Sequence, residues 1–173
     1  MINKSLIFLF AFYFLALFQT TFLVYFPIRG QIPNLIFIFL FLIIFFTFPE
    51  KEENLFSLGN LFPVLFSGFF MDLFSGFTIG VSIFLFFISV IVLGKILESI
   101  KEKNILVFLI LFLIFELIFY FLLFLFNIFF KRNIVSFPNL FLIQISYDLF
   151  FALFFFIIIS VFKQRKSLKK NYV

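Results

Sequence analysis

The chain contains no cysteine, no histidine and no tryptophan, and only 12% of its 173 residues are charged. Without cysteine it can form neither disulfides nor thiolate metal sites, and it has no thiol nucleophile. Without histidine it lacks the commonest general base and metal ligand. With so few charges it has too little polar surface to cover a water-soluble globule. The composition therefore excludes thiol chemistry, the usual zinc sites and a soluble fold.

The side chains that are present are overwhelmingly apolar. Hydrophobic residues make up 65% of the chain, the mean hydropathy is +1.31, and there are 40 phenylalanines. This composition predicts an all-α integral membrane protein that forms one polytopic membrane domain over residues 1–173. We interpret the phenylalanines as lipid-facing and helix-packing surface and not as a ligand cage.

Charged, proline and glycine clusters divide the chain into segments that are long enough to be membrane spans. A helix needs about 20 apolar residues to cross the hydrocarbon core. We expect a compact bundle of about six transmembrane helices, at residues 5–26, 33–48, 55–74, 78–97, 105–130 and 138–162. The second is the shortest. The first is expected to be a retained span, because no small-x-small cleavage site follows its apolar run. A basic tail follows at residues 163–173.

Lysine and arginine predict how the bundle is oriented. If both termini are cytoplasmic, ten basic residues lie inside and three lie outside: Arg29, Lys131 and Arg132. The loops are short enough for the positive-inside rule to apply, so we expect an N-in, C-in arrangement. This orientation puts the turn after Asp72 at the outer face and the basic tail against anionic lipid in the cytoplasm.

Three of the eight acidic residues, Asp72, Glu116 and Asp148, lie within predicted spans. A carboxylate there costs at least a few kcal/mol unless it is protonated, hydrogen-bonded, solvated or paired. Asp72 is two residues from the end of its span. It can accept hydrogen bonds from the N–H groups of Phe74 and Ser75, cap the following helix, or face a partner from a small outer cavity.

Glu116 and Asp148 form a second polar feature. Each lies ten or eleven residues from the start of its span, at a depth of roughly 15 to 17 Å for a rise of 1.5 Å per residue. We expect the two carboxyl groups to meet as a polar clasp between the last two helices, where they share one proton or form hydrogen bonds with Tyr120, Gln144, Ser146 or Tyr147. A cation or proton pathway and a contact with a partner are the alternatives. Two carboxyls without a nucleophile, a basic residue or a metal ligand set do not make an enzyme site.

The stretch from Gly68 to Gly80 reads Gly-Phe-Phe-Met-Asp-Leu-Phe-Ser-Gly-Phe-Thr-Ile-Gly. Its small residues Gly68, Ser75, Gly76 and Gly80 surround Asp72, and the Gly76 and Gly80 spacing is typical of close helix packing. The stretch resembles the Gly-Phe-x-x-Gly-Leu-x-x-Asp-Leu-x-Ser-Gly-x-x-x-Gly signature of the rod shape-determining protein MreD family, although Ser67-Gly68 lies nearer to the aspartate than in a full match.

Other features add to this resemblance to the MreD family. Gln19 followed by Pro33-Asn34-Leu35 is similar to the family's first-loop pattern, with Asn34 where an aspartate is common. Glu116 fits some members, and Tyr147-Asp148 stands where Tyr-Asn is frequent. Chain length, basic tail and span count agree across the whole sequence.

The resemblance implies a non-enzymatic, multi-pass subunit of the bacterial inner (cytoplasmic) membrane that takes part in peptidoglycan elongation. Its implied partners are membrane lipid, an MreC-like one-span protein, a RodA-like glycosyltransferase and a class B penicillin-binding protein. Neither a cofactor nor nucleic acid is expected. The short loops agree with this interpretation, because they leave no room for a catalytic domain.

Two other functions are alternatives. The first is the substrate-binding membrane subunit of an energy-coupling-factor vitamin transporter. The five-residue spacing of Ala11 and Ala16 argues against it, because those subunits often carry Ala-x-x-x-Ala in their first span. The second is a small ion or proton conductor that uses Glu116 and Asp148.

Overall fold

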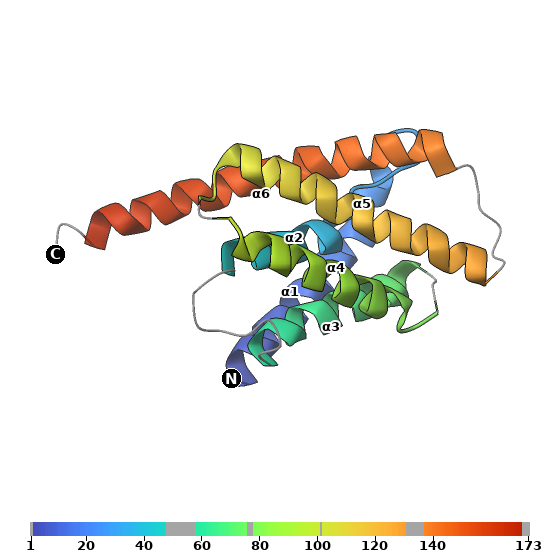
Figure 1. Ribbon diagram of the computed structural model, residues 1–173, viewed down its shortest axis with the longest axis horizontal. Helices are drawn as coiled ribbons and strands as arrows, with labels where there is room; N and C mark the ends of the chain where they lie inside the picture. The colour runs from blue at the N-terminus through green and yellow to red at the C-terminus, as the bar shows by residue number, and fades with distance from the viewer. Residues whose placement is uncertain (1, 48–57, 76–77, 101, 131–136, 171–173) are drawn as a thin grey trace.

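The computed structural model describes residues 2–47, 58–75, 78–100, 102–130 and 137–170, and all of its regular structure is helical (Figure 1). The expected all-α fold is confirmed for these residues. They form six α-helices and one short 3₁₀ helix: α1 Ile2–Thr21, η1 Leu23–Tyr25, α2 Leu35–Thr47, α3 Leu58–Ser75, α4 Val81–Glu98, α5 Ile105–Phe129 and α6 Phe137–Lys170.

Polar caps explain where two of the helices begin. The Asn34 side chain accepts a hydrogen bond from the N–H of Phe37, so α2 begins at Leu35 and not at Pro33. Asn104 caps α5 in the same way through the N–H of Val107. Asparagine is a favoured N-cap because its oxygen satisfies an N–H that has no partner within the helix.

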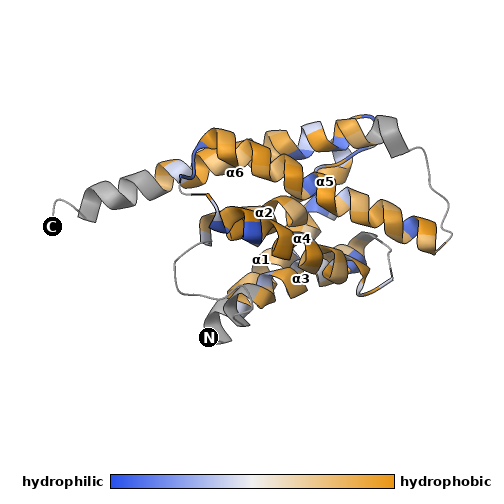
Figure 2. Ribbon diagram, in the orientation of Figure 1, coloured by the Kyte–Doolittle hydropathy of each residue, from blue (hydrophilic) through white to orange (hydrophobic). Residues whose placement is uncertain are grey.

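Four of the described helical segments are long and apolar enough to cross a membrane: Ser5–Tyr25, Val81–Glu98, Ile105–Phe129 and Phe141–Phe162. Two apolar helices are shorter, Leu35–Thr47 and Leu61–Phe74. Helix α6 continues to Lys170, so most of the expected basic tail is helical. Figure 2 shows hydrophobic residues along most of the helices, with a few hydrophilic positions between them.

The short helix α2 is the centre of the bundle. It contacts all five other α-helices, which form an arc around it in the order α1, α3, α4, α5, α6. Within the described residues, α1 and α6 are the two ends of this arc and do not approach each other. Figure 1 agrees, with α2 between the α5–α6 pair and the α1–α3 pair. Nine of the thirteen α2 residues are buried, although this helix is too short to span a membrane easily.

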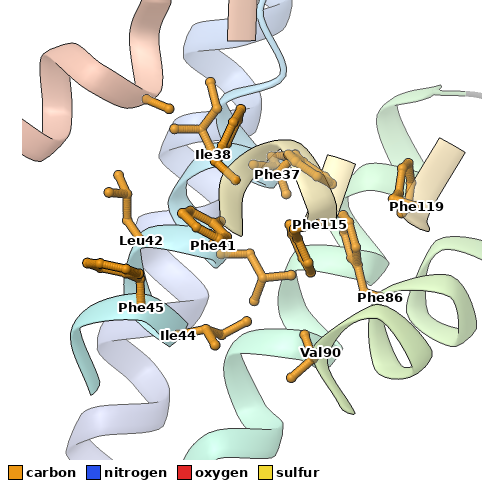
Figure 3. Close-up of a cluster of buried hydrophobic side chains, with 14 of the residues drawn as sticks. Phe37, Ile38, Phe41, Leu42, Ile44, Phe45, Phe86, Val90, Phe115 and Phe119 are labelled. Carbon is orange, nitrogen blue, oxygen red and sulfur yellow. The ribbon is translucent and has the colours of Figure 1, made fainter. Parts of the chain in front are cut away.

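Aromatic rings fill the contact between α2 and its neighbours (Figure 3). Phe37, Phe41 and Phe45 follow one another at a spacing of four residues, which puts them on one face of α2. The Phe37 ring lies 4.7 Å from that of Phe115 on α5, and the Phe41 ring lies 5.1 Å from that of Phe112, centroid to centroid. These separations are those of favourable aromatic pairs. Because lipid is as apolar as phenylalanine, close packing of this kind is what holds the helices together.

Candidate functional site

Buried and half-buried polar groups gather at the N-terminus of α2. The backbone N–H of Asn34 donates to Oδ1 of Asp148 at 2.7 Å, and the N–H of Leu35 donates to Oε1 of Gln19 at 3.0 Å. The Asn34 side chain itself accepts from Phe37 at 3.1 Å. Three helices thus cooperate here, because α1 provides Gln19 and α6 provides Asp148. The first N–H groups of α2, which have no partner within the helix, thus find acceptors on neighbouring helices.

Helix α6 also holds the segment that leads into α2. The Gln144 Nε2 group donates to Oδ2 of Asp148 at 2.8 Å and to the backbone oxygen of Ile32 at 3.0 Å. The Tyr147 hydroxyl donates to the backbone oxygen of Phe26 at 3.0 Å. Side chains less than two helical turns apart on α6 therefore position both α2 and the segment before it.

The opposite end of α2 is capped by a cation. Lys103, in the turn before α5, donates through Nζ to the backbone oxygen of Phe45, and Nζ lies 5.3 Å from the centre of the Phe45 ring. An acid at the N-terminus of a helix and a base at its C-terminus both interact favourably with the helix dipole. Helix α2 thus receives a complementary charge at each end.

Glu116 lies on α5, is fully buried, and interacts electrostatically with Asp148 and Tyr120. The two carboxyl groups therefore lie near each other, and the expected clasp between α5 and α6 stays a prediction. The two groups differ in their partners. Asp148 accepts hydrogen bonds from Asn34 and Gln144, whereas neither Glu116 oxygen makes a hydrogen bond of good geometry within the described residues.

The partners of Asp148 were predicted only in part. Gln144 was expected, but the Ser146 hydroxyl donates to the backbone oxygen of Leu142 and Tyr147 donates to Phe26. The link to Asn34 joins α6 to α2, and sequence reasoning missed it. Asn34 is an N-cap residue type directly before an apolar run, which indicates the start of a helix but not the residue that this start contacts.

Asp72 is buried near the C-terminal end of α3, and its carboxylate crosses the turn to α4. Oδ2 accepts from the N–H of Gly80 at 2.6 Å, and Oδ1 accepts from the N–H of Ser82 at 2.8 Å. The carboxylate therefore caps the following helix, which is one of the arrangements that the sequence allows. Among the described residues its hydrogen bonds are to α4 and its N-cap, and not to its own turn.

The small residues around Asp72 have different roles. Gly68 lies against α4 so closely that an added Cβ would be 2.5 Å from Cα of Ile83. Gly80 is the N-cap of α4, with a φ of +105°, and open space surrounds its missing side chain, so its role is conformational. Because Gly80 precedes α4, it is not part of a helix-packing Gly-x-x-x-Gly face. Ser75 is the last residue of α3, and Gly76 lies outside the described residues.

A cavity of about 220 Å³ lies beside the α2 N-terminus, lined by residues of α1, the segment before α2, α2 itself and α3, including Gln19, Asn34 and Met71. Its polar lining groups are amides and a hydroxyl, which favour hydrogen bonding and not nucleophilic chemistry. The described part of the chain contains no group of three His, Cys, Asp or Glu residues placed to hold a metal ion. The site is therefore an arrangement of helix caps around a buried helix.

Comparison of the chain with protein-family models, curated proteins and solved structures gave no match.

Proposed function

We propose that this protein is a non-catalytic subunit of the bacterial cell-elongation machinery in the inner membrane, with six spans and both termini in the cytoplasm. In this role it couples an MreC-like one-span protein, and through it the peptidoglycan synthases, to the cytoskeleton. The support is the resemblance of residues 68–80 to the MreD signature. The observation that carries the proposal is that the buried carboxylates of Asp72 and Asp148 and the half-buried amide of Gln19 serve as helix caps. These polar groups are used inside the bundle, and the helix faces are left for binding partners.

The gap between α1 and α6 is the place where we expect the one-span partner to bind. Since these two helices do not approach each other, α2 closes the bundle on this side. Its residues Phe39, Ile43 and Phe46 are only partly buried, whereas their neighbours in α2 are buried almost throughout. Their spacing of four and three puts them on one face of the helix. We call this face the α2 seam. A single apolar helix laid along it would bury a surface that the bundle itself leaves half covered.

Cross-linking tests this location directly, because the chain has no cysteine of its own. We expect Ile43→Cys to form a disulfide with a cysteine placed in the partner's span. Leu106→Cys is the matched control. Leu106 is 64% exposed near the start of α5, and it follows Lys103, which caps the C-terminal end of α2. Equal cross-linking from both positions would reject the seam as the binding face.

The cellular role has its own test. Depletion of the protein is expected to round the cells, and the MreC-like protein is expected to copurify with it. Rod-shaped cells after a clean deletion would overturn the proposed function. Tight copurification of a vitamin would instead support the transporter alternative.

A further inference from the structure

An arginine is held in an unfavourable backbone conformation next to α6. Ile28 and Gln31 exchange two backbone hydrogen bonds, of 2.9 and 3.0 Å, and so close a two-residue turn. Both central residues have positive φ, +51° for Arg29 and +82° for Gly30, the pattern of a type I′ turn. Glycine adopts this conformation easily, but at Arg29 it costs about 1 to 2 kcal/mol. Arg29 forms no ion pair with the acidic side chains that the structure describes.

The turn does not move freely relative to α6. Before it, the backbone oxygen of Phe26 accepts from Tyr147, and after it the oxygen of Ile32 accepts from Gln144. Both donors belong to the same helix and are three residues apart. The Arg29 turn is consequently fastened on both sides to one stretch of α6.

A groove of about 570 Å³ lies between this turn and α6. Its walls are mostly apolar, and Arg29 is the one charged residue among them: Ile28, Arg29, Leu142, Ile143, Ser146, Tyr147 and Phe150. Leu142 and Phe150 are 66% and 65% exposed, so the groove opens on a face of α6 that the bundle does not cover. Its volume is within the usual range for small-molecule sites, roughly 300 to 1,000 Å³.

We propose that this groove binds one anionic phospholipid, with an acyl chain along α6 and the phosphate against Arg29. Leu142, Ile143 and Phe150 supply the apolar wall that a hydrocarbon chain needs. The guanidinium supplies two parallel N–H donors that match phosphate oxygens. The inference is independent of the proposed role in cell elongation.

The charges and hydroxyls of the groove favour an anionic headgroup. The hydrogens of the Ser146 and Tyr147 hydroxyls are already donated to backbone oxygens of Leu142 and Phe26. Arg29 is therefore the side chain in the groove that can donate to an anion. A zwitterionic lipid would have its positive group close to the guanidinium, whereas phosphatidylglycerol carries only the negative phosphate.

Native mass spectrometry of the full chain in detergent, with phosphatidylglycerol or phosphatidylcholine added, tests the proposal. We expect the wild type to retain phosphatidylglycerol about tenfold more tightly, the effect of one charge-assisted contact. Arg29→Gly is expected to abolish this preference without lowering the unfolding temperature, because glycine relieves the strained turn. A loss of folding is thereby separated from a loss of binding.

Two further variants complete the experiment. Ser146→Trp should fill the groove from an exposed position and weaken the retention of both lipids. Lys95→Gln removes an equal charge from the last turn of α4 and should leave the preference unchanged. The proposal is overturned if the wild type retains both lipids equally, if Arg29→Gly keeps the preference, or if Lys95→Gln removes it.

Discussion

The backbone N–H of Asn34 donates to the Asp148 carboxylate at 2.7 Å, although the two residues are 114 positions apart in the chain. This hydrogen bond joins the start of the buried helix α2 to the first half of the apolar segment of α6. It gives the Asp148 carboxylate a donor and gives an unpaired helix N–H an acceptor. A buried acid that would be costly alone thus becomes part of the packing of the central helix.

Replacing Asp148 by leucine is expected to lower the free energy of unfolding by about 2 to 4 kcal/mol. The substitution leaves the Asn34 N–H without its acceptor, and the Gln144 amide loses one of its two hydrogen-bond acceptors. Asp148→Asn keeps one oxygen for Asn34 but sets its amide against the Gln144 amide, so we expect an intermediate loss. Thermal unfolding in detergent, followed by circular dichroism, checks this order. Equal stability of the leucine variant and the wild type would contradict the capping role.

Gly68→Ala is expected to destabilise the α3–α4 hairpin by about 2 kcal/mol or more, because overpacking a tight contact costs about 1 to 3 kcal/mol. The new Cβ would meet backbone atoms of Ile83 at 2.5 and 2.6 Å, and these cannot rotate away. Ile83→Ala removes the nearby side-chain atom but not this backbone clash. The double variant should therefore remain unstable in the same unfolding measurement, and full rescue by Ile83→Ala would show that the contact is a side-chain contact only.

Two Asp72 variants distinguish the role of the side chain as a helix cap from a role of its negative charge. Asn keeps one acceptor oxygen for the Gly80 or Ser82 N–H, whereas leucine keeps none. We expect a loss of about 1 kcal/mol for Asp72→Asn and about 2 to 4 kcal/mol for Asp72→Leu. Cell shape should follow the same order if the residue acts through the turn geometry. If Asp72→Asn rounds the cells as severely as Asp72→Leu, the negative charge itself is what a partner reads.

The helices were predictable from the sequence, because charged, proline and glycine clusters interrupt long apolar runs. The end of α3 was predicted within one residue, and the first residue of α5 was predicted correctly. Similar depths along the spans also predicted that Glu116 and Asp148 lie at one level of the bundle. These results follow from length and spacing alone, which are local properties of the chain.

The arrangement of the helices was not predictable in the same way. When nearly every position of a helix is apolar, no polar face distinguishes the side that packs from the side that meets lipid. Nothing local therefore identifies α2 as the central helix or Asn34 as the partner of Asp148. The strained Arg29 was missed for a related reason, since an arginine before a glycine usually indicates only a polar turn.

Lys103→Met tests the C-terminal cap of α2. The substitution keeps an apolar stem but removes the group that donates to the Phe45 backbone oxygen and lies over its ring. We expect a loss of about 1 to 2 kcal/mol in the free energy of unfolding. Lys103→Arg should recover part of it. Lys95→Gln serves as the control for a general effect of charge, and an equal loss there would show that the cap is not what stabilises the protein.

Glu116→Met is expected to leave the free energy of unfolding unchanged or to raise it by about 1 kcal/mol. Both carboxyl oxygens are buried without a well-formed hydrogen bond. An apolar side chain of similar size therefore removes the free-energy cost of burying these polar atoms. Glu116→Ala, which leaves a cavity, should instead cost about 2 to 4 kcal/mol. A loss with methionine as large as that with alanine would show that the carboxyl is itself a stabilising partner of Asp148.

A stable Glu116→Met protein then allows a functional test of the same carboxyl. If cells that carry it keep their rod shape, Glu116 is a tolerated part of the packing between α5 and α6. If they become round although the protein folds, the carboxyl acts on something outside the fold. The double variant Glu116→Gln and Asp148→Asn distinguishes the two remaining possibilities in liposomes. A conductor that uses these carboxyls must lose its ion or proton flux, whereas an unchanged flux excludes conduction through the pair and leaves contact with a partner.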